Sequence, residues 1–297
     1  MRQRLLKLAT ERKQDFGFVL TKYALERLLY RLSRSPHSEL FVLKGALLFD
    51  LWTTHPYRPT RDADFLGHGE PSGQRYAKIF EDICLQEVEP DGLSLLPGSI
   101  QVEKIKDDEE YEGIRVLLEA RLDRARIPLQ VDIGFGDIIT PAAVEVQYPT
   151  LLGFPPPILH AYPRETVVAE KFEAIVKLGM TNTRMKDFFD LWELSQQFEF
   201  EGATLSTAIK ATFDRRQTDI PSFMPLALTE EFSESPKKQT QWSAFLRKSG
   251  LKTHLSLSEV VTHLGTFLHP PTRAARNGED FQLLWSQGGS WQQIKSG

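Results

Sequence analysis

The chain has 297 residues, of which 41% are hydrophobic and 26% are charged, and its net charge is -4 at pH 7. These values are typical of a globular chain with one large domain or two ordinary ones, and they give no sign of bulk attraction to nucleic acid. The single cysteine, Cys84, excludes an internal disulfide and a zinc site of several cysteines, and it fits a reducing compartment. We find no membrane-spanning apolar run and no signal peptide, so we expect a cytoplasmic protein without a membrane partner.

Positive charge is concentrated at the N-terminus. Residues 1–34 hold nine Lys or Arg side chains against three acidic ones, a local net charge of +6. Such a stripe could meet RNA or an acidic partner protein, although a solvated helix face is the common explanation. Residues 18–32 place leucines at helical spacing with charged residues between them, which predicts an amphipathic helix.

The next segment alternates between short strands and helices. Residues 39–43 predict a buried strand and residues 44–52 a helix, so Lys44 and Gly45 lie at a strand-to-helix junction. The stretch "RDADFLG" at 61–67 predicts a strand with Asp62 and Asp64 on one face, because side chains alternate along a strand. Residues 76–86 predict a helix.

A hairpin is predicted from residues 113–122 and 127–137, which both alternate apolar and polar positions. On its second strand Asp132 faces away from the apolar set. Residues 148–163 contain five prolines and predict an extended connector. Further helices are predicted at 165–180, 184–198, 204–216 and 256–268, the last with a capping box from Ser256 to Glu259, while residues 270–297 stay unassigned. The fold class is therefore α+β, with an N-terminal α+β domain at 1–160 and a helical C-terminal domain at 161–297.

Three carboxylates stand on the polar faces of the predicted strands, namely Asp62, Asp64 and Asp132. If the two strands are neighbours, these carboxylates come together and form a site for Mg²⁺ or Mn²⁺, because such ions prefer oxygen ligands. Two ions there can hold an attacking hydroxyl and a leaving pyrophosphate. The alternative for Asp-Ala-Asp is a turn bonded to local backbone, which the following apolar strand disfavours.

Basic residues elsewhere suggest phosphate contacts. A glycine at a strand-to-helix junction lets backbone approach an anion, and Lys44 adds a charge there, although many such glycines serve conformation only. Lys171 lies on one face of the helix at 165–180 and either extends to water or contacts phosphate. Asp187 and Asp190 share one face of the next helix. The alternative to a functional role is that one of them forms a structural ion pair with Lys171, Lys186 or Arg184.

Together these motifs resemble the AbiEii/MenT-type nucleotidyltransferase toxins, a branch of the polymerase-beta-like nucleotidyltransferase superfamily. The resemblance is carried in order by "YALERLLYRLSRSPHSELFVLKGALLF", "RPTRDADFLG", "LQVDIGFGD", "YPRETVVAEKFEAIVKLGM" and "RMKDFFDLWEL". It implies a nucleotidyltransferase-like mixed sheet flanked by helices, and a helical C-terminal domain. It also implies transfer of NMP from an NTP to an acceptor, often the tRNA 3′ end, by a toxin that a cognate antitoxin neutralises.

Carried over to this chain, the resemblance implies roles for particular residues. Asp62 and Asp64 match the metal-binding pair, with Asp132 as the third carboxylate. The lysine–glycine turn is matched by Lys44 and Gly45. Among the remaining matches, the resemblance implies catalytic roles for Lys171 and Asp187. It implies nucleotide-binding roles for Arg58, Thr60 and Lys171. The wider superfamily has Gly-Ser where this chain has Gly45-Ala46, so backbone N–H groups and Lys44 would replace a serine contact to phosphate.

Our hypothesis is therefore a metal-dependent nucleotidyltransferase that releases pyrophosphate. Two alternatives stay open: an NTP- or partner-binding module without catalysis, and a Mg²⁺-dependent nuclease. The sequence does not indicate which NTP or which acceptor is used.

Overall fold

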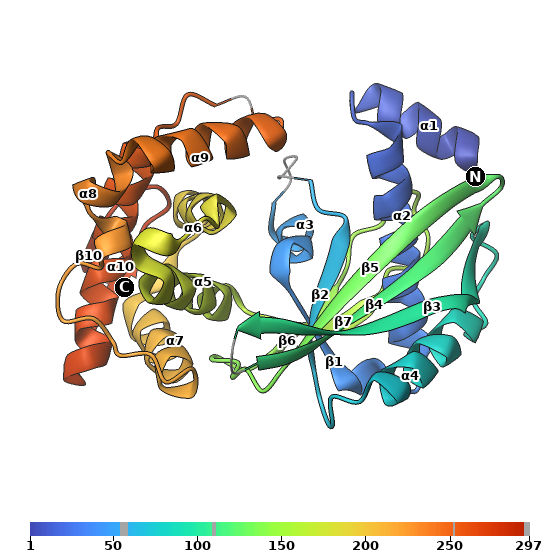
Figure 1. The fold of residues 1–297 in the computed structure, drawn as a ribbon, viewed down its shortest axis with the longest axis horizontal. Coiled ribbons are helices and arrows are strands. Elements are labelled where there is room, and N and C mark those ends of the chain that lie inside the picture. The colour runs from blue at the N-terminus through green and yellow to red at the C-terminus, as the bar shows by residue number, and fades with distance from the viewer. Residues whose placement is uncertain (54–58, 109–110, 252, 294–297) are drawn as a thin grey trace. The chain divides into compact units, whose positions relative to one another are not determined.

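A computed structural model of the protein describes residues 1–53, 59–108, 111–251 and 253–293 (Figure 1). The chain forms two compact units. The first comprises Met1–Gly136 and Ala143–Tyr162, and the second comprises Asp137–Ala142 and Pro163–Gly297. The short excursion 137–142 therefore belongs to the second unit, although it lies between two strands of the first.

The first unit is a sheet with helices. Its helices are α1 (Arg2–Glu11), α2 (Phe16–Arg34), α3 (Phe49–Trp52) and α4 (Gly73–Leu85), with short 3-10 turns at Ser38–Leu40 and Gly45–Leu48. Its strands are β1 (Phe41–Lys44), β2 (Asp62–Gly67), β3 (Leu93–Asp108), β4 (Tyr111–Leu122), β5 (Ala125–Phe135), β6 (Val144–Gln147) and β7 (Ile158–Ala161).

The strands form one seven-stranded mixed sheet in the order β3-β4-β5-β2-β1-β7-β6. Strands β2 and β5 run parallel, as do β1 and β7, and the other neighbouring pairs are antiparallel. This architecture confirms the predicted fold class, an α+β protein with a mixed sheet flanked by helices.

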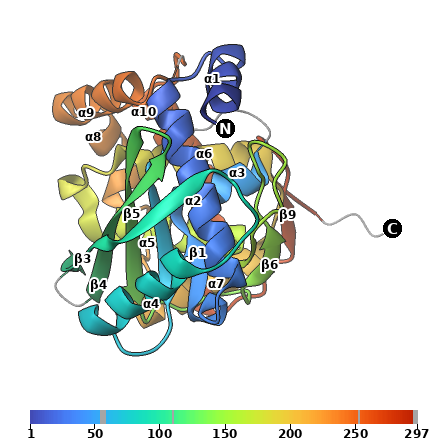
Figure 2. The ribbon, with the colours of Figure 1, turned by 90° about the vertical axis from the view of Figure 1, so that its right-hand side faces the viewer.

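One face of the sheet is apolar. Alternate residues of β4 and β5 are buried there, and α2 and α4 pack on the same strands (Figure 2). These residues include Ile114, Val116, Leu118, Leu129, Val131 and Ile133. Because successive side chains point to opposite faces, the same alternation puts the polar residues of β2, β4 and β5 on the other face.

Several basic side chains of α2 form ion pairs inside the first unit. Arg27 contacts Glu26 at 3.0 Å and is 1% exposed, and Arg31 contacts Asp91 at 2.7 Å. Lys22 is paired with Asp50 at 2.6 Å. Three of the nine basic residues of the N-terminal stripe are therefore used inside the first unit, and the stripe is smaller than its sequence suggests.

The second unit is helical. Its larger helices are α5 (Arg164–Leu178), α6 (Met185–Gln197), α7 (Gly202–Arg215), α9 (Pro236–Lys248) and α10 (Leu257–Asn277), with the short α8 (Glu230–Ser233). The capping box predicted at Ser256 and Glu259 is present at the start of α10. A small antiparallel sheet joins β8 (Phe200–Glu201), β9 (Leu283–Trp285) and β10 (Trp291–Gln293).

Residues beyond 270, which sequence patterns left unassigned, continue α10 and then form β9 and β10. The helix passes through Pro270 and Pro271, which lack the N–H that would bond to the preceding turn. The carbonyl of Phe267 accepts a hydrogen bond from Trp291 Nε1 at 3.0 Å instead. Tertiary contacts thus offset the helix-breaking residues.

Other segments also differ from the sequence prediction, and α9 and β6 are among those that were not predicted. The long strand β3 was not predicted, because Pro97 and Gly98 interrupt its alternation and a register irregularity follows Leu96. The proline-rich connector at 148–163 contains β7, which pairs with β1. In the described part of the chain, no helix combines the length and apolarity that crossing a bilayer requires.

Candidate active site

A row of charged residues crosses four neighbouring strands of the first unit. Lys44 on β1 is paired with Asp64 on β2, and Asp64 with Asp132 on β5. On the far side of β5, Arg115 on β4 is paired with Asp132. The carboxylates of Asp64 and Asp132 are therefore direct neighbours in the parallel pair. A basic side chain lies next to each of them, Lys44 beside Asp64 and Arg115 beside Asp132.

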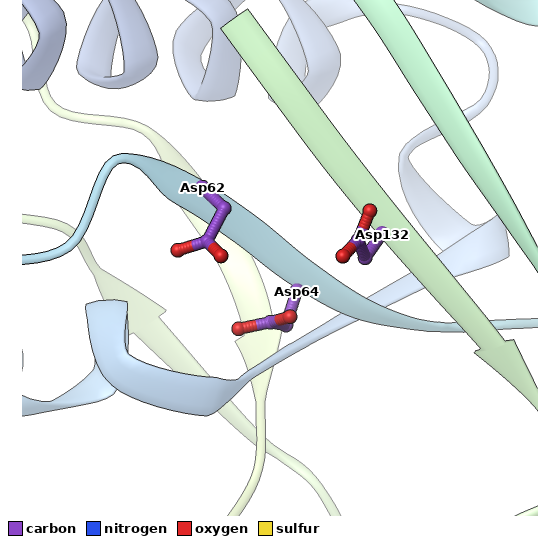
Figure 3. Close-up of side chains that lie close together, drawn as sticks. All are labelled: Asp62, Asp64 and Asp132. Carbon is purple, nitrogen blue, oxygen red and sulfur yellow. The ribbon is translucent and has the colours of Figure 1, made fainter. Parts of the chain in front are cut away.

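The three carboxylates predicted to form a metal site lie together (Figure 3). One oxygen from each of Asp62, Asp64 and Asp132 lies within 4.8 Å of the others, and all three residues are half-buried. Like charges this close repel each other, and a divalent cation with oxygen ligands would relieve the repulsion. The residues present thus fit an ion such as Mg²⁺ or Mn²⁺.

Asp132 is held by side chains of two strands. Arg115 donates from Nε to Oδ1 at 2.8 Å and from Nη2 to Oδ2 at 2.7 Å, a forked contact with both oxygens. Gln130 donates from Nε2 to Oδ2 at 3.0 Å. The hydrogen bond with Asp132 raises the pKa of Arg115. Neither Arg115 nor Gln130 was among the predicted site residues.

Asp62 and Asp64 are each in close contact with a residue expected to bind nucleotide. The hydroxyl of Thr60 donates to Asp62 Oδ1, so Thr60 contacts a carboxylate of the cluster. Gly45 has a positive φ of 74°, and a Cβ at this position would lie 2.0 Å from Asp64 Oδ2. Arg58, the other predicted phosphate contact, lies outside the described residues.

The side chain of Lys44 extends along the same face of the sheet. Its Nζ lies 3.2 Å from the position that a Cβ at Gly134 would take, and 6.0 Å from the ring centroid of Tyr162. Gly134 lies on β5, two residues after Asp132. The absence of a side chain at Gly134 therefore leaves room for the ammonium group of Lys44 near the carboxylate cluster.

Lys171 and Asp187, the remaining predicted site residues, lie in the second unit and contact each other. Lys171 Nζ is 2.7 Å from Asp187 Oδ1 and 2.8 Å from Asp190 Oδ2, and Arg184 Nε is 2.7 Å from Asp187 Oδ2. The side chain of Lys171 is only 14% exposed, so it does not extend into water. The ion pair that remained open as a structural alternative is thus present.

The charge of Asp187 depends on these partners. Burial raises the pKa of Asp187, but the attraction of Lys171 and Arg184 outweighs burial, so the pKa lies below its ordinary value. Asp187 and Asp190 are both fully buried. The cluster links α5 to α6 whatever else its members do.

Comparison with known proteins gives three matches. The model of a family described as nucleotidyl transferase AbiEii toxin, type IV toxin–antitoxin system, matches residues 27–267. The crystal structure of JHP933 from Helicobacter pylori is similar at 18% identity and a TM-score of 0.49, over 88% of this chain and 92% of that chain. A Helicobacter pylori structure described as a candidate nucleotidyltransferase has 18% identity and a TM-score of 0.50, over 88% and 95%. Comparison with curated proteins finds no match.

Proposed function

The chain belongs to the AbiEii nucleotidyl transferase toxin family of type IV toxin–antitoxin systems, and from this premise we propose that it transfers NMP from an NTP to an acceptor. The family that the sequence motifs resembled is thereby confirmed. The observation that carries the proposal is the group of three carboxylates, Asp62, Asp64 and Asp132, on adjacent strands of the sheet.

The carboxylates bind a divalent cation, Mg²⁺ or Mn²⁺, in this proposal. When bound, the cation would neutralise triphosphate charge and make the acceptor hydroxyl more acidic. Thr60 orients Asp62 through its hydrogen bond. Lys44, Arg58 and Lys171 stabilise the negative charge on the phosphates, while Gly45 lets the backbone of its turn approach them.

The reaction is a displacement at the α-phosphorus. The hydroxyl oxygen of the acceptor forms a bond to the α-phosphorus, and the bond between that phosphorus and the oxygen bridging to the β-phosphorus breaks. Pyrophosphate leaves with the electron pair, and the hydroxyl proton passes to water. The site residues lower the barrier mainly through charge and orientation.

The acceptor in this proposal is RNA, most specifically the 3′ end of tRNA. Support comes from the basic side chains of α1 that stay exposed, which are Arg2, Arg4 and Lys7. Phosphate contacts of this kind make binding depend strongly on salt. The family description supports a cognate antitoxin as protein partner, and the single cysteine supports a cytoplasmic location.

The proposal is tested by incubating the protein with each α-labelled NTP, Mg²⁺ and total RNA. We expect one or more nucleotides to enter RNA, to lengthen it at the 3′ end, and to be released as NMP by 3′ exonuclease. Asp64→Ala should abolish incorporation, since it removes the central carboxylate.

Three results would contradict the proposal. The first is equal labelling by wild type and Asp64→Ala, which would point to a contaminating activity. The second is shortening of RNA without added NTP, which would favour the nuclease alternative. Binding of NTP without turnover on RNA, protein or small-molecule hydroxyls would favour the inactive binding module.

A further inference from the structure

Arg115 on β4 contacts the side chain of Asp132 on the neighbouring strand β5. Its guanidinium forms two parallel hydrogen bonds with Asp132, at 2.8 and 2.7 Å, across the β4–β5 pair. A forked contact of this kind fixes the plane of a carboxylate as well as its position. The side chains of Arg115 and Asp132 are 33% and 19% exposed, so the pair is partly shielded from solvent.

The hydrogen bonds at Asp132 are unevenly divided between its two oxygens. Oδ2 accepts two, from Arg115 and Gln130, whereas Oδ1 accepts one, from Arg115. A carboxylate offers about four lone-pair positions, two on each oxygen. In the described contacts, the remaining lone pair is on Oδ1, and this oxygen can take one further ligand without giving up a hydrogen bond.

The same contact acts against repulsion in the cluster. Asp64 and Asp132 are direct neighbours in the parallel pair, and like charges in such positions destabilise a sheet. When no metal ion is bound, repulsion would turn the carboxylate of Asp132 away from Asp64 unless a protein side chain held it in place. Arg115 approaches from the opposite side of β5 and supplies that group.

We propose that Arg115 is a positioning residue, which orients Asp132 so that the third carboxylate is in place before a divalent cation binds. The inference rests on the proposed function, because it assigns Arg115 to the same carboxylate site. Arg115 is not a catalytic residue in this proposal, since it acts on substrate only through Asp132. Its removal should weaken cation binding more than it disturbs the fold.

The experiment is a titration of the full-length protein with Mn²⁺ in the absence of nucleotide, with free Mn²⁺ followed by electron paramagnetic resonance. Arg115→Ala should weaken Mn²⁺ binding by about 10- to 100-fold, the range for lost outer contacts to metal ligands. Arg115→Lys keeps the charge but loses the fork, and should fall between Arg115→Ala and wild type.

Arg121→Ala is the matched control. Arg121 lies on the same strand and contacts Glu119 at 3.0 Å, outside the carboxylate cluster. Its loss should leave Mn²⁺ binding at the wild-type level. Thermal unfolding of each variant shows whether the fold is kept, and if Arg115→Ala does not fold, Arg115→Lys decides the question.

Activity gives a second readout. With Mg²⁺ varied, Arg115→Ala should raise the half-saturating Mg²⁺ concentration by a larger factor than it lowers kcat at saturating Mg²⁺. A merely structural role would lower the active fraction and leave the half-saturating concentration unchanged.

The inference and the proposed function fail in different ways. If folded Arg115 variants bind Mn²⁺ as wild type does, the positioning role is wrong, even when wild type transfers nucleotides. If wild type transfers no nucleotide but its Mn²⁺ binding still depends on Arg115, the positioning role stands and the proposed function is wrong.

Discussion

Gly45 is a residue whose backbone lies close to Asp64, a carboxylate of the site. Its φ of 74° lies in the left-handed region, and a Cβ would lie 2.0 Å from Asp64 Oδ2. The first feature alone would favour glycine for conformational reasons. The second is specific to the site, because any side chain at this position must displace the carboxylate of Asp64.

Gly45→Ala should therefore lose activity in excess of its loss of stability. Backbone strain should cost about 1–2 kcal/mol of unfolding free energy, and displacement of Asp64 should lower kcat/KM by about 100-fold. The measurements are urea unfolding and nucleotide transfer. Gly153→Ala is the matched control, since Gly153 has a similar φ of 71° and no atom within 4 Å of its Cβ position.

Gly153→Ala should lose a similar amount of unfolding free energy and keep the wild-type kcat/KM. If both variants lose the same small fraction of kcat/KM, the close approach of Gly45 to Asp64 has no catalytic consequence, and the glycine serves conformation only.

Residue patterns allowed the three carboxylates to be predicted, but not the side chains that bond to them. Alternation is local, so it put Asp62, Asp64 and Asp132 on polar faces without knowledge of the fold. The partner of Asp132 depends on the register of the hairpin. Counting back from the two-residue turn at Asp123 and Arg124 does place Arg115 opposite Asp132, so a signal existed. No comparable local signal relates β2 to β5, which are distant in sequence.

At the scale of elements, α5 and α6 are joined by buried charges. Lys171 on α5 contacts both Asp187 and Asp190 on α6. Removing one member of such a group leaves its partners buried with incomplete compensation, and this typically costs about 3–5 kcal/mol. The packing of these two helices should therefore depend on the ionisation of the cluster.

Asp187→Asn tests this dependence through pH. The pKa of Asp187 is lowered in the folded protein, so this carboxylate stabilises the fold above the ordinary Asp pKa of about 3.9 and loses that contribution as pH falls below it. Wild-type unfolding free energy should thus decrease on acidification below about pH 4. Asp187→Asn should be less stable at neutral pH and should lose part of this pH dependence.

The measurement is urea unfolding across the acidic range. Asp214→Asn is the control, because Asp214 forms an exposed ion pair with Lys210 at 3.1 Å, and exposed pairs contribute about 1 kcal/mol or less. An Asp187→Asn profile parallel to that of wild type would show that other carboxylates account for the acid sensitivity.

Elements were predicted well where the pattern is continuous, as in α2, α6 and the β4–β5 hairpin. Some were missed where proline or glycine breaks the pattern, whereas α9 was not predicted although its only proline is its first residue. Pro97 and Gly98 interrupt β3, and α10 continues beyond its predicted end at residue 268 through Pro270 and Pro271, where Trp291 donates to the carbonyl of Phe267. Local propensity fails at these points because the compensating partner is distant in sequence.

At the scale of the whole molecule, each of the two units contains a cluster of charged residues that the sequence singled out. The carboxylates and Lys44 lie in the first, and Lys171 and Asp187 lie in the second. The excursion at 137–142 ties the chain to the second unit, where Arg216 Nη2 lies 3.0 Å from Asp137 Oδ1 and Arg216 Nη1 lies 2.9 Å from Glu173 Oε2. The sequence around residue 137 gives no local signal for this excursion, because the arginine that contacts Asp137 follows nearly eighty residues later.

The carboxylates and Lys171 have different proposed roles, so we predict that cation binding and transfer can be separated by mutation. Asp64→Ala should lose both Mn²⁺ binding and nucleotide transfer, because it removes a ligand of the carboxylate cluster. Lys171→Met should keep Mn²⁺ binding, since Lys171 is not a ligand, while transfer should be lost with its charge. Binding is measured by Mn²⁺ titration, transfer by incorporation of labelled nucleotide into RNA, and folding by thermal unfolding. If a folded Lys171→Met variant transfers nucleotide as wild type does, Lys171 has only a structural role, through its ion pairs with Asp187 and Asp190.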